Sequence, residues 1–223
     1  SAASDVYKRQ PRFNQNINEE YFNDFDVTIY RDRFGVPHII GKKDKDTAYG
    51  LAYAHAEDDF ETIQDMMLFA RGKLASKKGR KMASSDYLLQ LLKVWEVVNA
   101  NYDSNISAET KSILNGYAAG LNHYALKNPK MTHRGLFPVT AKDIVAGFVH
   151  RMPLMFGLDD AIKNATEKGS SEFAFLNYNT KGFDQKVLGS NQIAVAPSRS
   201  ADGYTRLAIN PHQPWMGPVT FYE

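Results

Sequence analysis

The feature that most constrains this chain is a change of hydrophobic pattern along its 223 residues. In four segments between residues 44 and 163, apolar residues recur every three or four positions, which is the spacing of helices that bury one face. In residues 164–189 polar residues and glycine dominate and no period survives, as expected for a linker or an exposed loop. Strand-like residues follow. The pattern predicts an α+β protein with a helical block, a spacer and the start of a sheet.

The first predicted helix begins at Asp44 and has the clearest buried face. Its apolar positions are spaced alternately four and three residues apart, which keeps them on one side of the helix. They are Ala56, Phe60, Ile63, Met67, Ala70 and Leu74. The acidic run 57–59 cannot share one helix face, so at least one of its carboxylates is expected to pair with an arginine such as Arg71.

Capping signals predict where the other three helices begin. Asp86 is expected to cap the second helix and Ser107 the third. Residues 140–143, Thr-Ala-Lys-Asp, have the form of a capping box and predict the start of the fourth. Pro153 is expected to kink or end that helix. Its predicted apolar stripe consists of Ile144, Phe148 and Met152.

Short strands are predicted near both ends of the chain. Residues 26–32 and 36–40 flank a glycine turn, and residues 191–196 and 204–209 flank the turn signal Ser-Ala-Asp-Gly. The last residues, VTFYE, stop within a strand-like run, which predicts a truncated chain. Residues 1–12 have no periodicity and no apolar centre, and are set aside as a leader or read-in segment.

Composition excludes several classes of site and partner. There is no cysteine, so disulfides, thiolate metal sites and a cysteine nucleophile are excluded. The 27 basic and 25 acidic residues give a net charge of +2, too small a field to favour nucleic acid or an anionic membrane. No apolar run approaches the roughly 20 residues that a transmembrane helix needs.

Gly189-Ser190 lies where the polar spacer turns into a strand. In one interpretation Ser190 is only a turn serine. In the other, the peptide bond after Gly189 is cut, and Ser190 then carries both a hydroxyl and a free α-amine, so that one residue supplies nucleophile and base. The α-amine has a reference pKa of about 7.7–8.0, so roughly a tenth is neutral at pH 7. Spacing among the six histidines does not select any conventional serine-histidine pair.

Several stretches in order, DVTIYRDRFGVPHIIG, TAYGLAYAHAEDDF, ARGKL, GSNQIAVAPSRSADG and NPHQPWMGPVTFYE, resemble the penicillin acylase family of N-terminal-nucleophile hydrolases. The last block is most similar to the acyl-homoserine lactone acylase and aculeacin A acylase branch. The resemblance implies a four-layer αββα sandwich. It also implies a helical α-subunit region (13–163), a spacer peptide (164–189) and the start of a β-subunit (190–223).

The resemblance also implies roles for individual residues. Gly189-Ser190 would be the autoproteolytic junction, Ser190 the nucleophile that forms an acyl-enzyme, and His212 a supporting histidine near it. Met152 and Phe156 match two residues that line the acyl pocket in penicillin-hydrolysing members, although plain core packing is an equal alternative for that spacing. The protein would be a precursor, inactive until it is processed to an αβ heterodimer and completed by the rest of its β-subunit.

One position departs from the lactone and aculeacin acylases. Gln213 stands where phenylalanine usually walls the acyl pocket, which argues against a preference for long alkyl chains unless its amide is hydrogen-bonded. The substrate is therefore left open between an acyl-homoserine lactone or lipopeptide amide and the side chain of a β-lactam. A non-catalytic helical binding domain is the alternative from another class.

No cofactor is assigned from the sequence. Calcium occurs in some family members, but the adjacent Asp159 and Asp160 point in different directions on a helix and are better explained as a solvated face. His123, His133 and His150 share no metal-like spacing with one another, and His55 is expected to be a half-buried structural residue. A periplasmic or secreted location is implied by the resemblance alone.

Overall fold

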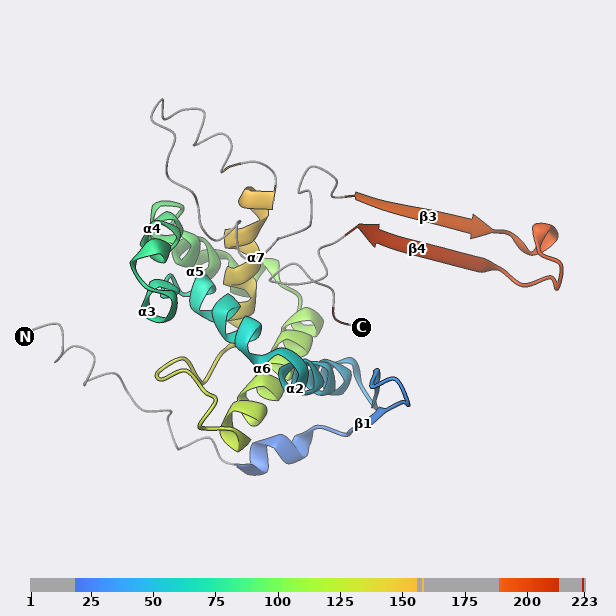
Figure 1. Cartoon of the computed structure of the whole chain (residues 1–223), viewed down its shortest axis with the longest axis horizontal. Coiled ribbons are helices and arrows are strands. Elements are labelled where there is room, and N and C mark those ends of the chain that lie inside the picture. The colour runs from blue at the N-terminus through green and yellow to red at the C-terminus, as the bar shows by residue number, and fades with distance from the viewer. Residues whose placement is uncertain (1–18, 156–157, 159–188, 213–221, 223) are drawn as a thin grey trace, which may run out of the picture. The chain divides into compact units, whose positions relative to one another are not determined.

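The computed structural model of the protein describes residues 19–155, 158, 189–212 and 222. The chain divides into two compact units, and each is described by itself. The first contains the helices and one β-hairpin, and the second contains a later β-hairpin (Figure 1). Among the described residues this is an α+β chain, as the sequence pattern predicts. Residues 1–12, and the predicted spacer except Gly189, lie outside the described residues.

The elements of the first unit are η1 (Glu19–Asp24), β1 (Val27–Arg31), β2 (Pro37–Gly41), α2 (Asp44–Ala70), α3 (Ala75–Lys78), η2 (Arg80–Met82), α4 (Ala83–Leu91), α5 (Val94–Asn105), α6 (Ala108–Lys127) and α7 (Ala141–Met155). Those of the second are β3 (Gly189–Val195), η4 (Pro197–Arg199) and β4 (Arg206–His212). Both hairpins, β1–β2 and β3–β4, are antiparallel.

Helix α2 is the centre of the first unit, and its predicted apolar face is confirmed. All six residues from Ala56 to Leu74 named for that face are buried, but the helix ends at Ala70 and Leu74 lies beyond it, at the start of α3. The helix is interrupted at Asp59, whose backbone is not helical (φ −146°, ψ 59°). The Asp59 carboxylate accepts a hydrogen bond from the backbone N–H of Thr62 at 3.2 Å, so it caps the second half of the helix.

Helices α2 and α6 approach closely because two glycines of α6 face α2. A Cβ at Gly116 would lie 2.2 Å from the carbonyl oxygen of Lys45, and one at Gly120 would lie 2.2 Å from that of Tyr49. Both distances are far below van der Waals contact, so only glycine permits this crossing. The crossing of these two helices is visible in Figure 1.

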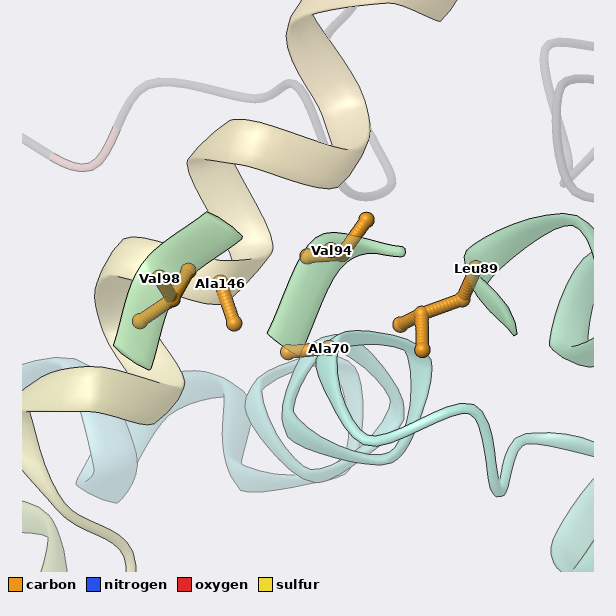
Figure 2. Close-up of a cluster of buried hydrophobic side chains, with 5 residues drawn as sticks. All are labelled: Ala70, Leu89, Val94, Val98 and Ala146. Atoms are coloured by element: carbon orange, nitrogen blue, oxygen red, sulfur yellow. The ribbon is translucent and has the colours of Figure 1, made fainter. Parts of the chain in front are cut away.

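A second buried cluster joins α2 to α4, α5 and α7. It consists of Ala70, Leu89, Val94, Val98 and Ala146, shown in Figure 2. The indole N–H of Trp95 donates to the Ala70 carbonyl at 2.9 Å, which satisfies a carbonyl left free at the end of α2. The predicted second helix is in fact two, α4 and α5, because Lys93 between them adopts a left-handed conformation (φ 52°).

Two of the three predicted caps are found where the sequence places them. Ser107 accepts a hydrogen bond from the Thr110 backbone N–H at 3.1 Å and caps α6. Before α7, Asp143 accepts from the Thr140 backbone N–H at 2.7 Å. The cap predicted at Asp86 is wrong, because α4 begins three residues earlier. The Asp86 carboxylate instead accepts the backbone N–H groups of Leu74 and Ala75, at 2.8 and 2.9 Å, at the start of α3.

The expectation that the acidic run pairs with an arginine is confirmed, but the arginine is Arg31 and not Arg71. Arg71 forms a bidentate pair with the buried Asp143, with Nε–Oδ1 at 2.7 Å and Nη2–Oδ2 at 2.9 Å, and so joins the end of α2 to the start of α7. Glu57 and Asp58 pair with Arg31 of β1 instead, at 3.2 and 3.0 Å. The acidic run therefore holds the first hairpin against α2.

Helix α7 differs from its prediction in both length and orientation. It continues past Pro153 to Met155, so the proline does not end it. Of the predicted apolar stripe, only Ile144 is buried, whereas Phe148 is 62% exposed and Met152 43% exposed. Ala146, His150 and Leu154 are buried instead. Ala146 clusters with Ala70 of α2, and His150 stacks on Phe69 of α2. The helix thus has apolar residues on two faces, and the spacing alone does not tell which one faces α2.

Candidate functional site

The register of the β3–β4 hairpin brings the predicted reactive residues to its open end. Gly189 is paired with His212, and Ser190 with Pro211. The sequence predicts two strands around the Ser200–Gly203 turn, and both are confirmed. The junction between Gly189 and Ser190 therefore lies at the first two positions of a strand, directly across from His212.

Ser190 and His212 belong to opposite faces of the hairpin. Paired residues of antiparallel strands project to the same face, and successive residues along a strand alternate. One face therefore carries Asn191, Asn210 and His212, and the other carries Ser190 with Pro211. In this hairpin His212 is placed beside the Gly189 end of the junction, rather than on the face to which the Ser190 hydroxyl belongs.

Two asparagines contact the His212 ring. The Nδ2 atom of Asn191 lies 3.1 Å from His212 Nε2, and the Nδ2 atom of Asn210 lies 3.3 Å from the same nitrogen. The sequence interpretation singled out neither asparagine. Alternation along a strand was the available signal. It places Asn210, two residues before His212, on the face of His212, and it places Asn191, next to Ser190, on the face opposite Ser190. That these two faces are the same one is known only from the strand register.

The other end of the hairpin is held by Asp202. Its carboxylate accepts hydrogen bonds from Ser200 Oγ at 2.6 Å and from Arg206 Nη1 at 2.7 Å. The hydrogen bond from the Arg206 guanidinium is the main cause that holds the pKa of Asp202 well below its usual range, and the Ser200 hydroxyl adds to it. Gly203 takes a positive φ of 75°, which suits glycine in the turn. The turn thus fixes the register that pairs Gly189 with His212.

The predicted pocket residues are only partly described. Met152 is 43% exposed on α7, so it is not core within the described residues, and a role in the acyl pocket stays a prediction. Phe156 and Gln213 lie outside the described residues.

Within the described ranges 19–155 and 189–212, no group of three or more histidine, aspartate or glutamate side chains is arranged so that it could hold a metal ion. Asp159 and Asp160 lie outside those ranges.

The histidines of the helical block have structural surroundings. His55 Nδ1 lies 3.3 Å from the hydroxyl of Tyr117, which confirms the expected half-buried histidine. His123 stacks on Phe22 with ring centroids 4.4 Å apart, and His150 stacks on Phe69 at 3.9 Å. Burial lowers the pKa of His150 to about 4, so the ring is neutral at pH 7.

The sequence profile of the penicillin amidase family matches residues 26–223. The chain belongs to this family. The match includes both hairpins, the helical block and the Gly189-Ser190 junction. The resemblance of the sequence motifs to penicillin acylases is thereby confirmed.

Relatives within the penicillin amidase family have acylase names. The chain is 28% identical to the acyl-homoserine lactone acylase PvdQ of Pseudomonas putida over 90% of this chain, but over only 29% of that protein. The PvdQ of Pseudomonas fluorescens is also 28% identical, over 87% of this chain and 28% of its own length. The penicillin acylase 2 proenzyme of Pseudomonas sp. (strain SE83) is 30% identical over 44% of this chain and 12% of its own length.

The chain therefore spans less than a third of the length of these relatives. Among solved structures, a thermostable penicillin G acylase from Alcaligenes faecalis is similar with a TM-score of 0.45 and 19% identity, over 64% of this chain and 85% of that one.

Within the described residues, no helix is long and apolar enough to cross a membrane.

Proposed function

We propose that the full-length protein is an N-acyl amide hydrolase precursor that cuts itself between Gly189 and Ser190 and then uses Ser190 as nucleophile. Membership of the penicillin amidase family carries the proposal. It is supported by the position of the junction at the first two residues of β3, where the peptide bond lies in an extended strand end rather than inside the helical block. The precursor and the completed αβ heterodimer would be two states of one protein.

The self-cleavage needs no group beyond the chain and water. Ser190 Oγ attacks the Gly189 carbonyl carbon, the C–N bond between the two residues breaks, and the nitrogen takes the hydroxyl proton. The product is an ester between Gly189 and Ser190 Oγ, next to a free α-amine. Water then hydrolyses the ester, which leaves a carboxylate on Gly189 and restores the hydroxyl of Ser190.

The free amine gives Ser190 its own base for turnover. As Oγ attacks the substrate amide carbon, the α-amine takes the hydroxyl proton and passes it to the leaving amine. An acyl ester on Ser190 remains, and water hydrolyses it. The α-amine does not exist while Gly189 is bonded to Ser190, so the uncut chain has the nucleophile without this base. The groups that would stabilise the oxyanion are not assigned in this chain.

We favour an acyl-homoserine lactone or a lipopeptide-type amide as the substrate. The relatives named for acyl-homoserine lactones match 87–90% of this chain. The side chain of a penicillin or cephalosporin is the second candidate, because a relative named penicillin acylase 2 proenzyme matches 44% of it. We extend the proposal to a periplasmic or secreted location, which fractionation of cells that express the full-length protein would test.

The substrate proposal is tested by incubating the processed full-length protein with acyl-homoserine lactones of increasing chain length and with penicillin G, and quantifying the free amine. Release of homoserine lactone is expected, and Ser190→Ala should abolish it. Gln213→Phe should shift the preference toward longer chains. An unchanged chain-length profile would remove Gln213 from the pocket, and turnover of penicillin alone would favour the second candidate.

A further inference from the structure

The His212 ring is held on one edge by two amide groups from different strands. Asn191 lies on β3 and Asn210 on β4, and both present Nδ2 to the same ring nitrogen, Nε2, at 3.1 and 3.3 Å. Three polar side chains of one hairpin face thus converge on one point beside the Gly189-Ser190 junction. This arrangement depends on the register, since a slip by one residue would move His212 to the other face.

The chemistry of the amide group determines the protonation of the ring. An asparagine Nδ2 carries two hydrogens and no lone pair that can accept, so it only donates. When Nδ2 is the amide atom that meets Nε2 in both contacts, Nε2 is the acceptor and the proton of the neutral imidazole resides on Nδ1. The two amides share the single in-plane lone pair of Nε2, which leaves that nitrogen poorly available as a base.

We propose that Asn191 and Asn210 are positioning residues that fix His212 in the Nδ1–H tautomer, so that His212 acts as a hydrogen-bond donor through Nδ1 and not as a general base through Nε2. This inference rests on the proposed function for its catalytic consequence. It divides the chemistry between two groups: the hydroxyl proton of Ser190 goes to the α-amine after processing, while His212 supplies a donor at the Gly189 end of the junction. Both asparagines follow the junction in sequence, so both stay in the Ser190 chain after cleavage.

The charge variants Asn191→Asp and Asn210→Asp test the proposal sharply. A carboxylate only accepts hydrogen bonds, so each variant should draw the ring proton to Nε2 or stabilise the doubly protonated ring. Gln192→Glu is the matched control, because it introduces the same charge on the same strand but on the opposite face, where Ser190 lies.

The direct measurement is the ¹⁵N NMR spectrum of histidine-labelled, full-length protein carrying Ser190→Ala, which is expected to remain uncut. The His212 signals are assigned by their loss in His212→Gln. We expect a protonated Nδ1 and an unprotonated Nε2 in this parent and in the Gln192→Glu variant, and a protonated Nε2 in both asparagine variants. A protonated Nε2 in the parent would overturn the proposal.

A kinetic measurement uses chains that keep Ser190. Asn191→Asp and Asn210→Asp should slow self-cleavage and turnover by about tenfold or more, a scale taken from the loss of hydrogen-bond partners that orient metal-binding histidines. Gln192→Glu should change either rate by less than about twofold. Equal effects of all three variants would overturn the proposal. If the His212 tautomer is as expected but the protein that keeps Ser190 never cuts itself, the proposed function fails while the role of the two asparagines stands.

Discussion

The helical block and the β3–β4 hairpin differ in how their apolar side chains are covered. In the block, the α2 face and the cluster around Ala70 are buried by α4, α5, α6 and α7. In the hairpin, Ile193, Leu207 and Ile209 are 66%, 60% and 63% exposed. A two-stranded hairpin alone is marginally stable in water. The folding energy of the described chain is therefore concentrated in the helices, whereas the candidate chemistry lies in the hairpin. We expect that substitutions can change stability and activity separately.

The largest separation is expected for His212→Ala. It removes the hydrogen-bond donor beside the junction, so self-cleavage and turnover should fall by about 10²-fold or more, the range for the loss of one preorganised donor. The melting temperature of the helical block should stay the same. Rates come from cleavage time courses and stability from thermal unfolding of the full-length protein. Equal losses of activity and stability would make His212 a structural residue.

The next largest expected effect is on the stability of the helical block alone. Gly120→Ala places a methyl group against the Tyr49 carbonyl and should lower the free energy of unfolding by about 3 kcal/mol, because the two helices must separate. Gly147→Ala is the matched control. Its Cβ would meet only the Ala70 Cβ at 3.7 Å, an ordinary contact, so it should be neutral or slightly stabilising. Denaturant unfolding of both variants measures the difference, and equal losses would contradict the close crossing.

Acid should destabilise the block through His150. Burial lowers the pKa of this ring from 6.5 to about 4, so the unfolded chain binds the proton more readily between these values. The contribution of His150 to stability is therefore complete above pH 6.5 and is lost as the pH falls toward 4.

From pH 7 to pH 5 this loss should amount to about 2 kcal/mol. His150→Leu should remove that part of the pH dependence in denaturant unfolding. His38→Gln, on the exposed β2, leaves His150 in place and should keep the acid loss of the parent. An unchanged pH dependence in His150→Leu would show that another group causes it.

The smallest expected effect is at a helix cap. Ser107→Ala removes the hydroxyl that accepts the Thr110 N–H and should cost about 1 kcal/mol. Ser112→Ala, at an exposed position within α6, is the control and should be neutral or slightly stabilising. The difference between the two in unfolding free energy measures the cap. No difference would mean that water replaces the serine.

Local patterns predicted the parts of the fold that depend on neighbouring residues. The buried face of α2, the cap at Ser107 and both hairpin turns follow from periodicity and turn chemistry. The Arg71–Asp143 pair joins residues 72 positions apart, and the role of Asp86 depends on how α3 folds back, so neither was visible in the sequence. For α7, two apolar faces competed and tertiary packing selected the other one.

The candidate site divides in the same way. The motifs predicted Gly189, Ser190 and His212 as site residues, and these roles stay predictions, whereas the contacts of Asn191 and Asn210 required the strand register. The four-layer sandwich, the domain boundaries and the roles of Phe156 and Gln213 remain predictions, because they depend on residues outside those described.

The most direct test is the intact mass of the full-length protein after folding, compared with Ser190→Ala and with Ser198→Ala, which changes an exposed serine of η4. The account predicts two chains in the parent and in Ser198→Ala, one ending at or before Gly189 and one beginning at Ser190, and a single uncut chain in Ser190→Ala. A folded parent that remains uncut, or a cut that persists in Ser190→Ala, would contradict it.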